Sequence, residues 1–201
     1  MKNIVILGAN GRIAKLVTKS LEDDQNFKTT LFLRNKDRLQ NLADKFKIVE
    51  GDVTDGAALS AVLAGQDVVY ANLAGKNIEA QARQLVQAMD QAGVKRLIWV
   101  SSLGIYDEVP GAFGKWNKET LGNYLTTYRA AVDQIEASDL DYTIIRPAWL
   151  TDHDEVAYEI TLRNEPFKGT EVSRKSVAAV IYQLLQHPEQ QIRESIGINK
   201  P

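Results

Sequence analysis

The sequence contains no cysteine among its 201 residues. This absence excludes disulfide bonds, thiolate catalysis and cysteine-ligated zinc sites. The formal net charge is only −2, so no basic excess attracts nucleic acid or an anionic membrane. No apolar run approaches the roughly 18 residues that a membrane-spanning helix requires. We therefore expect neither nucleic acid nor a membrane as a direct partner.

The composition that remains suffices to bury a proper core. Hydrophobic residues make up 44% of the chain and charged residues 25%, and no linker or low-complexity stretch divides it. We expect a single domain over residues 1–201, with a small substrate-side region at about residues 148–172. Because Met1 to Asn3 lead straight into an apolar strand, we expect no signal peptide and a soluble, cytoplasmic protein. The sequence does not indicate an oligomeric state.

Strand-like and helix-like segments alternate along the chain. Strands are expected at residues 4–7, 29–33, 47–49, 67–73, 96–101, 142–146 and 195–198. Helices are expected at residues 36–45, after a cap at Thr54 or Asp55, at 77–92 and 117–137, and from a Ser173 cap to Gln186. Strands that are apolar on both faces and separated by helices predict an α/β fold with a doubly wound parallel sheet. Right-handed crossovers give the NAD(P)-binding Rossmann order 3-2-1-4-5-6.

The most informative motif follows the first strand, in the run Gly8-Ala9-Asn10-Gly11-Arg12-Ile13-Ala14. Gly8 permits a tight turn, Gly11 lets the backbone approach a phosphate, and the small Ala14 lets the next helix pack closely on the strand. Free amides and the positive end of the helix dipole then point at one spot. This spot is suited to a pyrophosphate.

The ends of the next strands predict the rest of a dinucleotide site. Arg34, with Asn35, Lys36 and Arg38 close behind it, favours the 2′-phosphate of NADP(H), whereas Asp37 nearby keeps NAD(H) possible. Asp52, with the Val53 backbone beside it, is positioned to accept from the adenine amino group, or is an ordinary turn aspartate. The run Asn72-Leu73-Ala74-Gly75 offers small residues and backbone groups to the second half of the cofactor. Ser101 and Ser102 would stand near the nicotinamide, although serine at a strand end is also common turn chemistry.

Two further groups of residues have a structural and a functional interpretation. Asp152, His153, Asp154 and Glu155 gather potential metal ligands, but neighbours in one loop rarely converge, and we expect no metal site. The aromatic residues beyond strands five and six either close the core or form a pocket for an acceptor; they are Tyr106, Phe113, Trp116 and Trp149.

Several motifs together resemble the atypical short-chain dehydrogenase/reductases. They are Gly8 to Ile13, Leu33-Arg34-Asn35, Gly51-Asp52-Val53-Thr54-Asp55, Val100-Ser101-Ser102 and Leu140-Asp141-Tyr142-Thr143-Ile144-Ile145-Arg146-Pro147. The resemblance is to the small NAD(P)H-binding proteins similar to flavin or biliverdin reductases and to nitrogen-regulator-type redox sensors. It implies cofactor-binding roles for Gly8, Asn10, Gly11, Arg12, Ile13, Arg34, Asp52 and Val53. It also implies that Pro147 and Ala148 line the nicotinamide end and that Trp149 to Asp154 begin a substrate-side loop.

The chain departs from the wider family at its catalytic pair. Many short-chain dehydrogenases carry Tyr-x-x-x-Lys on one helix face, and no tyrosine here has lysine at that spacing. Judged by distance from the Leu140 motif, Arg129 stands at the lysine position and Leu125 at the tyrosine position. Arg129 is expected to bond ribose or phosphate oxygens without relaying a proton. The catalytic residues are therefore not identified, and the weak candidates are Ser101, Ser102, Tyr124 and Tyr128.

These observations predict an oxidoreductase that binds NADP(H), or alternatively NAD(H). Hydride transfer to a flat conjugated acceptor such as a flavin or quinone needs no protein acid, because the proton comes from water. The alternative is a non-catalytic NADP(H)-binding redox sensor or regulator, so enzymatic activity is not settled by the sequence. A nucleotide-sugar epimerase or dehydratase fits less well with the short C-terminal region.

Overall fold

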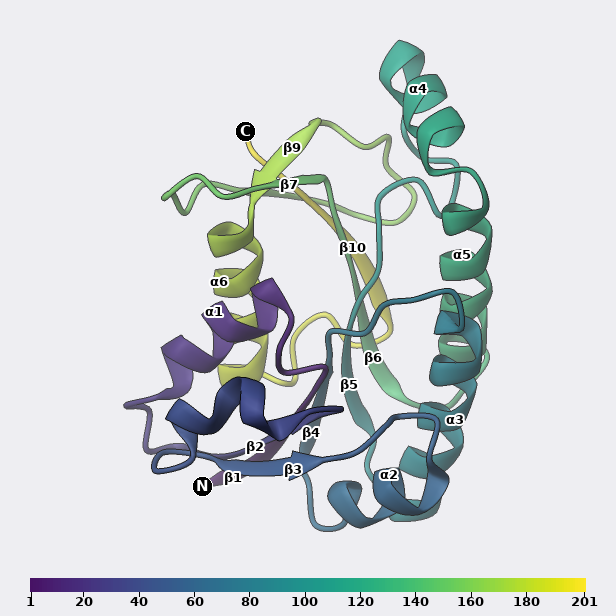
Figure 1. Ribbon diagram of the computed structural model, residues 1–201. Coiled ribbons are helices and arrows are strands. Elements are labelled where there is room, and N and C mark those ends of the chain that lie inside the picture. The colour runs from purple at the N-terminus through teal and green to yellow at the C-terminus, as the bar shows by residue number, and fades with distance from the viewer.

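An eight-stranded, mostly parallel sheet forms the middle layer of the protein (Figure 1). The computed structural model describes residues 1–201. The strand order is β3-β2-β1-β4-β5-β6-β10-β8, and β7 pairs with β9 in a separate two-stranded sheet. The strands are β1 Lys2–Leu7, β2 Phe27–Leu33, β3 Lys47–Glu50, β4 Val68–Ala71, β5 Arg96–Val100, β6 Asp141–Pro147, β7 Trp149–Thr151, β8 Glu159–Thr161, β9 Glu171–Ser173 and β10 Glu194–Asn199.

Helices cover both faces of the sheet (Figure 1). Helices α1 and α6 pack on one face, and α2, α3 and α5 pack on the other. The helices are α1 Arg12–Leu21, α2 Gly56–Leu63, α3 Ile78–Ala92, α4 Gly111–Leu121, α5 Asn123–Glu136 and α6 Arg174–Gln186. Helix α4 extends beyond the end of the sheet, away from the other helices (Figure 1). None of these helices is long and apolar enough to cross a membrane.

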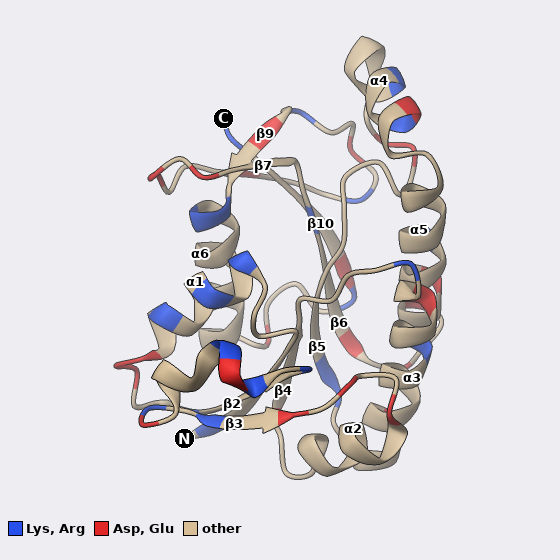
Figure 2. Ribbon diagram, viewed as in Figure 1, with Lys and Arg blue, Asp and Glu red and all other residues tan.

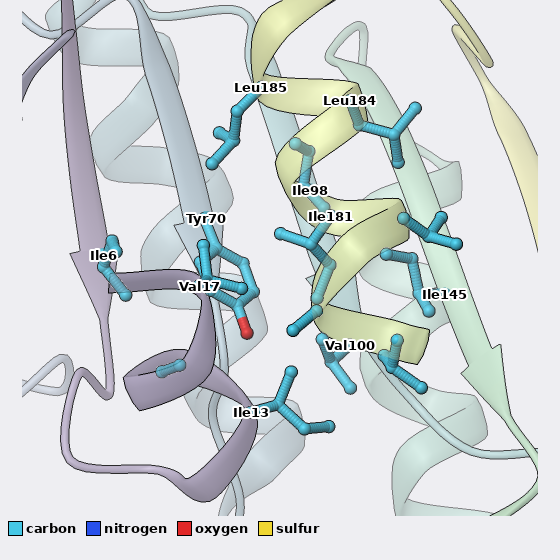
Figure 3. Close-up of a cluster of buried hydrophobic side chains, with 14 of the residues drawn as sticks. Ile6, Ile13, Val17, Tyr70, Ile98, Val100, Ile145, Ile181, Leu184 and Leu185 are labelled. Carbon is cyan, nitrogen blue, oxygen red and sulfur yellow. The ribbon is translucent and has the colours of Figure 1, made fainter. Parts of the chain in front are cut away.

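Alternating side chains of the central strands supply two hydrophobic cores. In β4, Val68 and Tyr70 join the core under α1 and α6, whereas Val69 and Ala71 join the core under α2, α3 and α5. Figure 3 shows the first core, in which Tyr70 lies between side chains of the sheet and of the two helices. Burial on both faces explains why these strands read as continuous apolar runs.

The predicted doubly wound fold and its 3-2-1-4-5-6 strand order are confirmed. The chain extends this order with β10, which pairs parallel to β6, and with β8, which pairs antiparallel to β10. The predicted caps are confirmed too: Asp55 accepts from the amides of Ala57 and Ala58, and Ser173 accepts from the amide of Ser176.

Two predicted helices are wrong in detail. The segment expected to be helical over residues 36–45 is a 3₁₀ helix, Lys36–Leu42, interrupted by the non-helical backbone of Leu39. The segment expected to be one helix over 117–137 belongs to two helices separated by Gly122. Gly122 has φ +45°, a conformation that glycine adopts without steric cost. The break allows α4 to leave the direction of α5.

Candidate functional site

The glycine turn between β1 and α1 leaves several backbone donors free. Gly8 and Ala9 donate to the carbonyl of Phe32, and Gly11 donates to the carbonyl of Gly8. The amides of Arg12, Ile13 and Ala14 precede the first intrahelical bond, and no side chain caps the helix. These donors, together with the positive end of the helix dipole, form a favourable place for an anion.

Both glycines of the turn make room for Asn72, which follows β4. Gly8 has φ +74°, and a Cβ on it would overlap the Asn72 carbonyl oxygen. A Cβ on Gly11 would overlap the side-chain nitrogen Nδ2 of Asn72. A larger residue at Gly8 would therefore displace the backbone after β4, whereas one at Gly11 would displace the Asn72 side chain. The side-chain nitrogen Nδ2 of Asn72 consequently lies over the glycine turn.

A cavity of about 640 Å³ opens at this edge of the sheet. It brings together residues from the carboxyl ends of β1, β2, β3 and β4, the position at which parallel α/β sheets bind ligands. The predicted site residues that line it are Gly8, Asn10, Gly11, Arg34, Asp52, Val53, Asn72, Leu73 and Ala74. The remaining lining residues are Phe32, Leu33, Asn35, Arg38, Gly51, Gly75, Asn77 and Gln81.

The end of the cavity beside β2 carries two arginines. Arg34 and Arg38 are both exposed, and neither guanidinium forms an ion pair with a carboxylate. Figure 2 shows positive residues on both sides of Asp37 in the segment after β2. Asp37 does not line the cavity. The β2 end of the cavity is therefore rich in positive charge.

Asp52 is a fixed carboxylate in the same part of the cavity. Its Oδ1 accepts from the backbone amide and the hydroxyl of Thr54, at 2.8 and 2.7 Å. These hydrogen bonds, with a smaller contribution from Arg34, hold the pKa of Asp52 below its usual value. Its second oxygen remains available to accept a hydrogen bond from a ligand such as an adenine amino group.

Some predicted cofactor residues do not reach this cavity with their side chains. Arg12 is paired with Asp152 of the segment after β7, and the Ile13 side chain is buried in the core beneath α1. Both can still contribute backbone amides at the helix start. Ser101 and Pro147, at the ends of β5 and β6, are buried beyond the cavity lining. Their contact with a cofactor stays a prediction.

Arg129 of α5 is held by protein side chains. Its guanidinium pairs with Asp133 at 2.5 Å and stacks 4.6 Å from the ring centre of Tyr106. Arg129 is not among the residues that line the cavity. The predicted contact between Arg129 and a cofactor stays a prediction.

Tyr124 and Tyr128 stack one helical turn apart on α5. Their ring centres are 3.9 Å apart, and Tyr128 is buried whereas 41% of Tyr124 is exposed. Burial, and the hydrogen bond to Tyr128, raise the pKa of Tyr124. Burial also raises the pKa of Tyr128, although hydrogen bonds from Tyr124 and the Gly75 backbone oppose this shift. Both hydroxyls therefore stay protonated near neutral pH, close to one border of the cavity.

An aromatic ledge lies at the same edge of the sheet, beyond β5 and β6. It consists of Phe113 and Trp116 of α4 and Trp149 of β7. The ring centres of Trp116 and Trp149 are 4.9 Å apart, and those of Phe113 and Trp116 are 5.8 Å apart. Trp149 Nε1 donates to Asn117, the one buried residue of α4. Because Trp116 remains 48% exposed, the ledge presents an accessible apolar surface.

A buried ion pair fixes the loop that connects β5 to α4. Arg146 donates to Glu108 at 2.6 Å, and their side chains are 0% and 5% exposed. Glu108 also accepts from the amides of Gly104 and Tyr106. Ser101 and Ser102 precede this loop; the Ser102 hydroxyl donates to the carbonyl of Leu103, whereas the buried Ser101 hydroxyl has no partner.

The acidic residues after β7 form ion pairs with different arginine and lysine side chains. Asp152 pairs with Arg12 and Arg174, Asp154 pairs with Lys175, and Glu155 pairs with Lys200. No group of histidine and carboxylate side chains converges as metal ligands would. The segment instead ties the substrate-side region to α1 and α6.

Sequence reasoning named Asn35 and Arg38 beside Arg34, and both line the cavity. It missed Asn77 and Gln81, which lie at the start of α3 and resemble ordinary polar helix residues. Gln81 donates to the carbonyl of Ala74 at 3.1 Å and to Asn77 at 2.8 Å. These bonds hold the loop after β4 in place.

Comparison with known proteins identifies the family. Residues 8–188 match the model of the NAD(P)H-binding family, and the chain belongs to that family. The UPF0659 protein YMR090W of Saccharomyces cerevisiae is 27% identical, with 97% of this chain and 92% of the yeast protein covered.

Two solved structures extend this comparison. A Rossmann-fold NAD(P)-binding family protein from Shigella flexneri is 48% identical and has a TM-score of 0.88. The match covers 100% of this chain and 94% of the Shigella chain. A short-chain dehydrogenase/reductase from Veillonella parvula, solved in complex with NADP, is 29% identical, covers 100% and 95%, and has a TM-score of 0.92. The resemblance to short-chain dehydrogenase/reductases is thereby confirmed.

Proposed function

We propose that this protein is an NADP(H)-dependent oxidoreductase that transfers hydride to a flat acceptor of the flavin or quinone type. The observation that carries the choice of cofactor is the pair of arginines, Arg34 and Arg38, in a cavity continuous with the glycine turn. Guanidinium groups without carboxylate partners suit a 2′-phosphate. The Veillonella relative in complex with NADP supports the same choice.

The residues at the turn fit the remainder of the cofactor. The free amides of Arg12, Ile13 and Ala14 suit a pyrophosphate, and Asp52 has one oxygen left to accept from adenine. When bound, the nicotinamide supplies the hydride. The chain itself binds and orients the cofactor. Arg34 and Arg38 select the 2′-phosphate, and the glycine turn holds the pyrophosphate at the centre of the dinucleotide.

The acceptor side of the proposal is supported by the aromatic ledge. Phe113, Trp116 and Trp149 offer ring faces on which a flat conjugated molecule can stack. The protonated hydroxyls of Tyr124 and Tyr128 offer hydrogen bonds but no readily released proton. Reduction of a flavin or quinone does not require one, because its proton can come from water.

A redox sensor is the second candidate, and α4 is the observation that favours it. This helix extends beyond the sheet and carries the exposed Trp116, so it can contact a protein partner (Figure 1). In that case the ratio of NADPH to NADP⁺ would govern the contact.

Stopped-flow measurement of NADPH oxidation against a panel of flavins and quinones tests the proposal. We expect turnover with at least one acceptor, and a slower reaction after Trp149→Ala. The matched control is Trp99→Phe, since Trp99 is a fully buried tryptophan of β5 in the core under α2, α3 and α5 and is not part of the ledge. Tight binding of NADPH without its oxidation by any acceptor would reject the oxidoreductase hypothesis in favour of the redox-sensor hypothesis. Absence of dinucleotide binding would overturn both.

A further inference from the structure

Tyr70 places a single buried hydroxyl in the centre of the sheet, beneath the cofactor cavity. None of its surface is exposed, and it is surrounded by apolar side chains of the sheet and helices. Its hydroxyl has one partner, Asn72 Oδ1, at 3.3 Å. Figure 3 shows the hydroxyl oxygen directed toward the end of the core where Ile13 lies. A buried hydroxyl requires such a partner, because leaving it without one costs free energy.

This bond decides which way the Asn72 amide faces. A hydroxyl donates to the carbonyl oxygen of an amide, so Oδ1 turns toward Tyr70 and Nδ2 turns away from it. Nδ2 lies in the space over Gly11 that a side chain would occupy, and it donates to no protein group. Asn72 also lines the cavity. A hydrogen-bond donor is thus held at the phosphate-binding turn.

We propose that Tyr70 is a positioning residue that holds the Asn72 amide so that Nδ2 donates to the pyrophosphate of a bound dinucleotide. This inference rests on the proposed cofactor binding and adds a side-chain donor to the free amides of Arg12, Ile13 and Ala14. Without Tyr70 the amide can rotate and present its oxygen, which repels phosphate oxygens. The buried hydroxyl therefore acts on the ligand through Asn72 and does not touch it.

This role can be tested by measuring, with calorimetry, the binding of two ligands of which only one contains a pyrophosphate. One is 2′-phospho-ADP-ribose, which contains the pyrophosphate, and the other is adenosine 2′-monophosphate, which lacks it. In Tyr70→Phe we expect the dissociation constant of the first ligand to rise about fivefold, the effect of one ordinary hydrogen bond, with that of the second unchanged. Tyr142→Phe is the control, since Tyr142 is buried near the amino end of β6, two strands from β4.

A double-mutant cycle separates positioning from a general effect on the fold. Asn72→Ala should weaken the binding of 2′-phospho-ADP-ribose and leave that of adenosine 2′-monophosphate unchanged. Adding Tyr70→Phe to Asn72→Ala should cause no further loss of affinity. Equal weakening of both ligands in a folded Tyr70→Phe variant, or no weakening of either, would overturn the positioning role. Additive losses in the cycle would overturn it as well. If the unmodified protein bound neither ligand, the proposed cofactor binding itself would fail.

Discussion

The side-chain amide of Asn72 fills the space that a Cβ on Gly11 would take. Gly11 therefore serves the contact between the turn and β4, in addition to the predicted approach of a phosphate. The backbone carbonyl of the same asparagine stands where a Cβ on Gly8 would be. Both glycines of the motif thus accommodate one residue that is distant in the sequence, and this arrangement has consequences that can be measured.

Replacement of Gly11 by alanine should weaken dinucleotide binding while the protein remains folded. The added Cβ displaces Asn72 Nδ2 and narrows the anion site, and we expect a loss of at least about tenfold, or about 1.4 kcal/mol. Gly56→Ala is the control, because its Cβ would meet only the flexible end of Gln84. Titration of NADPH into both variants, with circular dichroism to monitor folding, provides the measurement. Unchanged affinity in Gly11→Ala would contradict the steric argument.

Replacement of Arg34 by alanine should weaken the binding of NADPH much more than the binding of NADH. A charge-assisted contact with the 2′-phosphate contributes about 1.5–3 kcal/mol, which is about one to two decades in affinity. Arg38→Ala should change the same preference in the same direction. Lys36→Ala is the matched control, since Lys36 is exposed in the same segment but does not line the cavity. Equal losses for both cofactors in the arginine variants would show that these residues do not select NADPH.

The stacked tyrosines should be dispensable for hydride transfer. Tyr124→Phe and Tyr128→Phe retain the aromatic stack and remove only the hydroxyls. We expect flavin or quinone reduction to stay within a few fold, whereas loss of a general acid costs about 10²–10⁴-fold. Single-turnover rates at saturating NADPH measure this directly. A loss of that size with cofactor binding preserved would assign acid chemistry to the tyrosine concerned.

The ion pair between Arg146 and Glu108 should show strong coupling in stability. Removal of either partner leaves an uncompensated buried charge, and we expect Arg146→Met or Glu108→Leu to cost about 3–5 kcal/mol of unfolding free energy. The double variant should cost far less than the sum of the two. Arg129→Ala, which breaks a partly exposed ion pair within one helix, should cost less than about 1 kcal/mol. Urea denaturation of the four variants tests the prediction, and additive single losses would refute it.

The sequence predicts those parts of the site that local patterns determine. Gly8, Gly11, Arg34 and Asp52 follow strands in a fixed chain order, so the parallel topology brings them to one edge. The direction of a side chain on a helix depends on tertiary packing, so the sequence did not reveal the partners of Arg129, and its contact with a cofactor stays a prediction. The structure shows its guanidinium paired with Asp133 and Glu136 and stacked on Tyr106.

Long-range partners explain the other differences. The interval 117–137 has helical composition throughout, and Gly122 breaks it through a backbone conformation that composition does not reveal. The short strands β7, β8 and β9 contain only three residues each, and their partners lie elsewhere in the chain. Likewise, the bond between Tyr70 and Asn72 is local, but its meaning depends on Gly11, which the fold brings beside it.

The exposure of Arg34 and Arg38 implies that the proposed selection of NADPH depends on ionic strength. Salt screens the interactions of exposed charges, with a screening length of about 10 Å at 0.1 M ionic strength. The less exposed backbone donors at the start of α1 are screened less, so their attraction for an anion decreases less. The preference for NADPH over NADH should consequently decrease as salt rises, while binding of the part shared by both cofactors changes less. Selectivity measured in dilute buffer would then overstate the selectivity that operates in a cell.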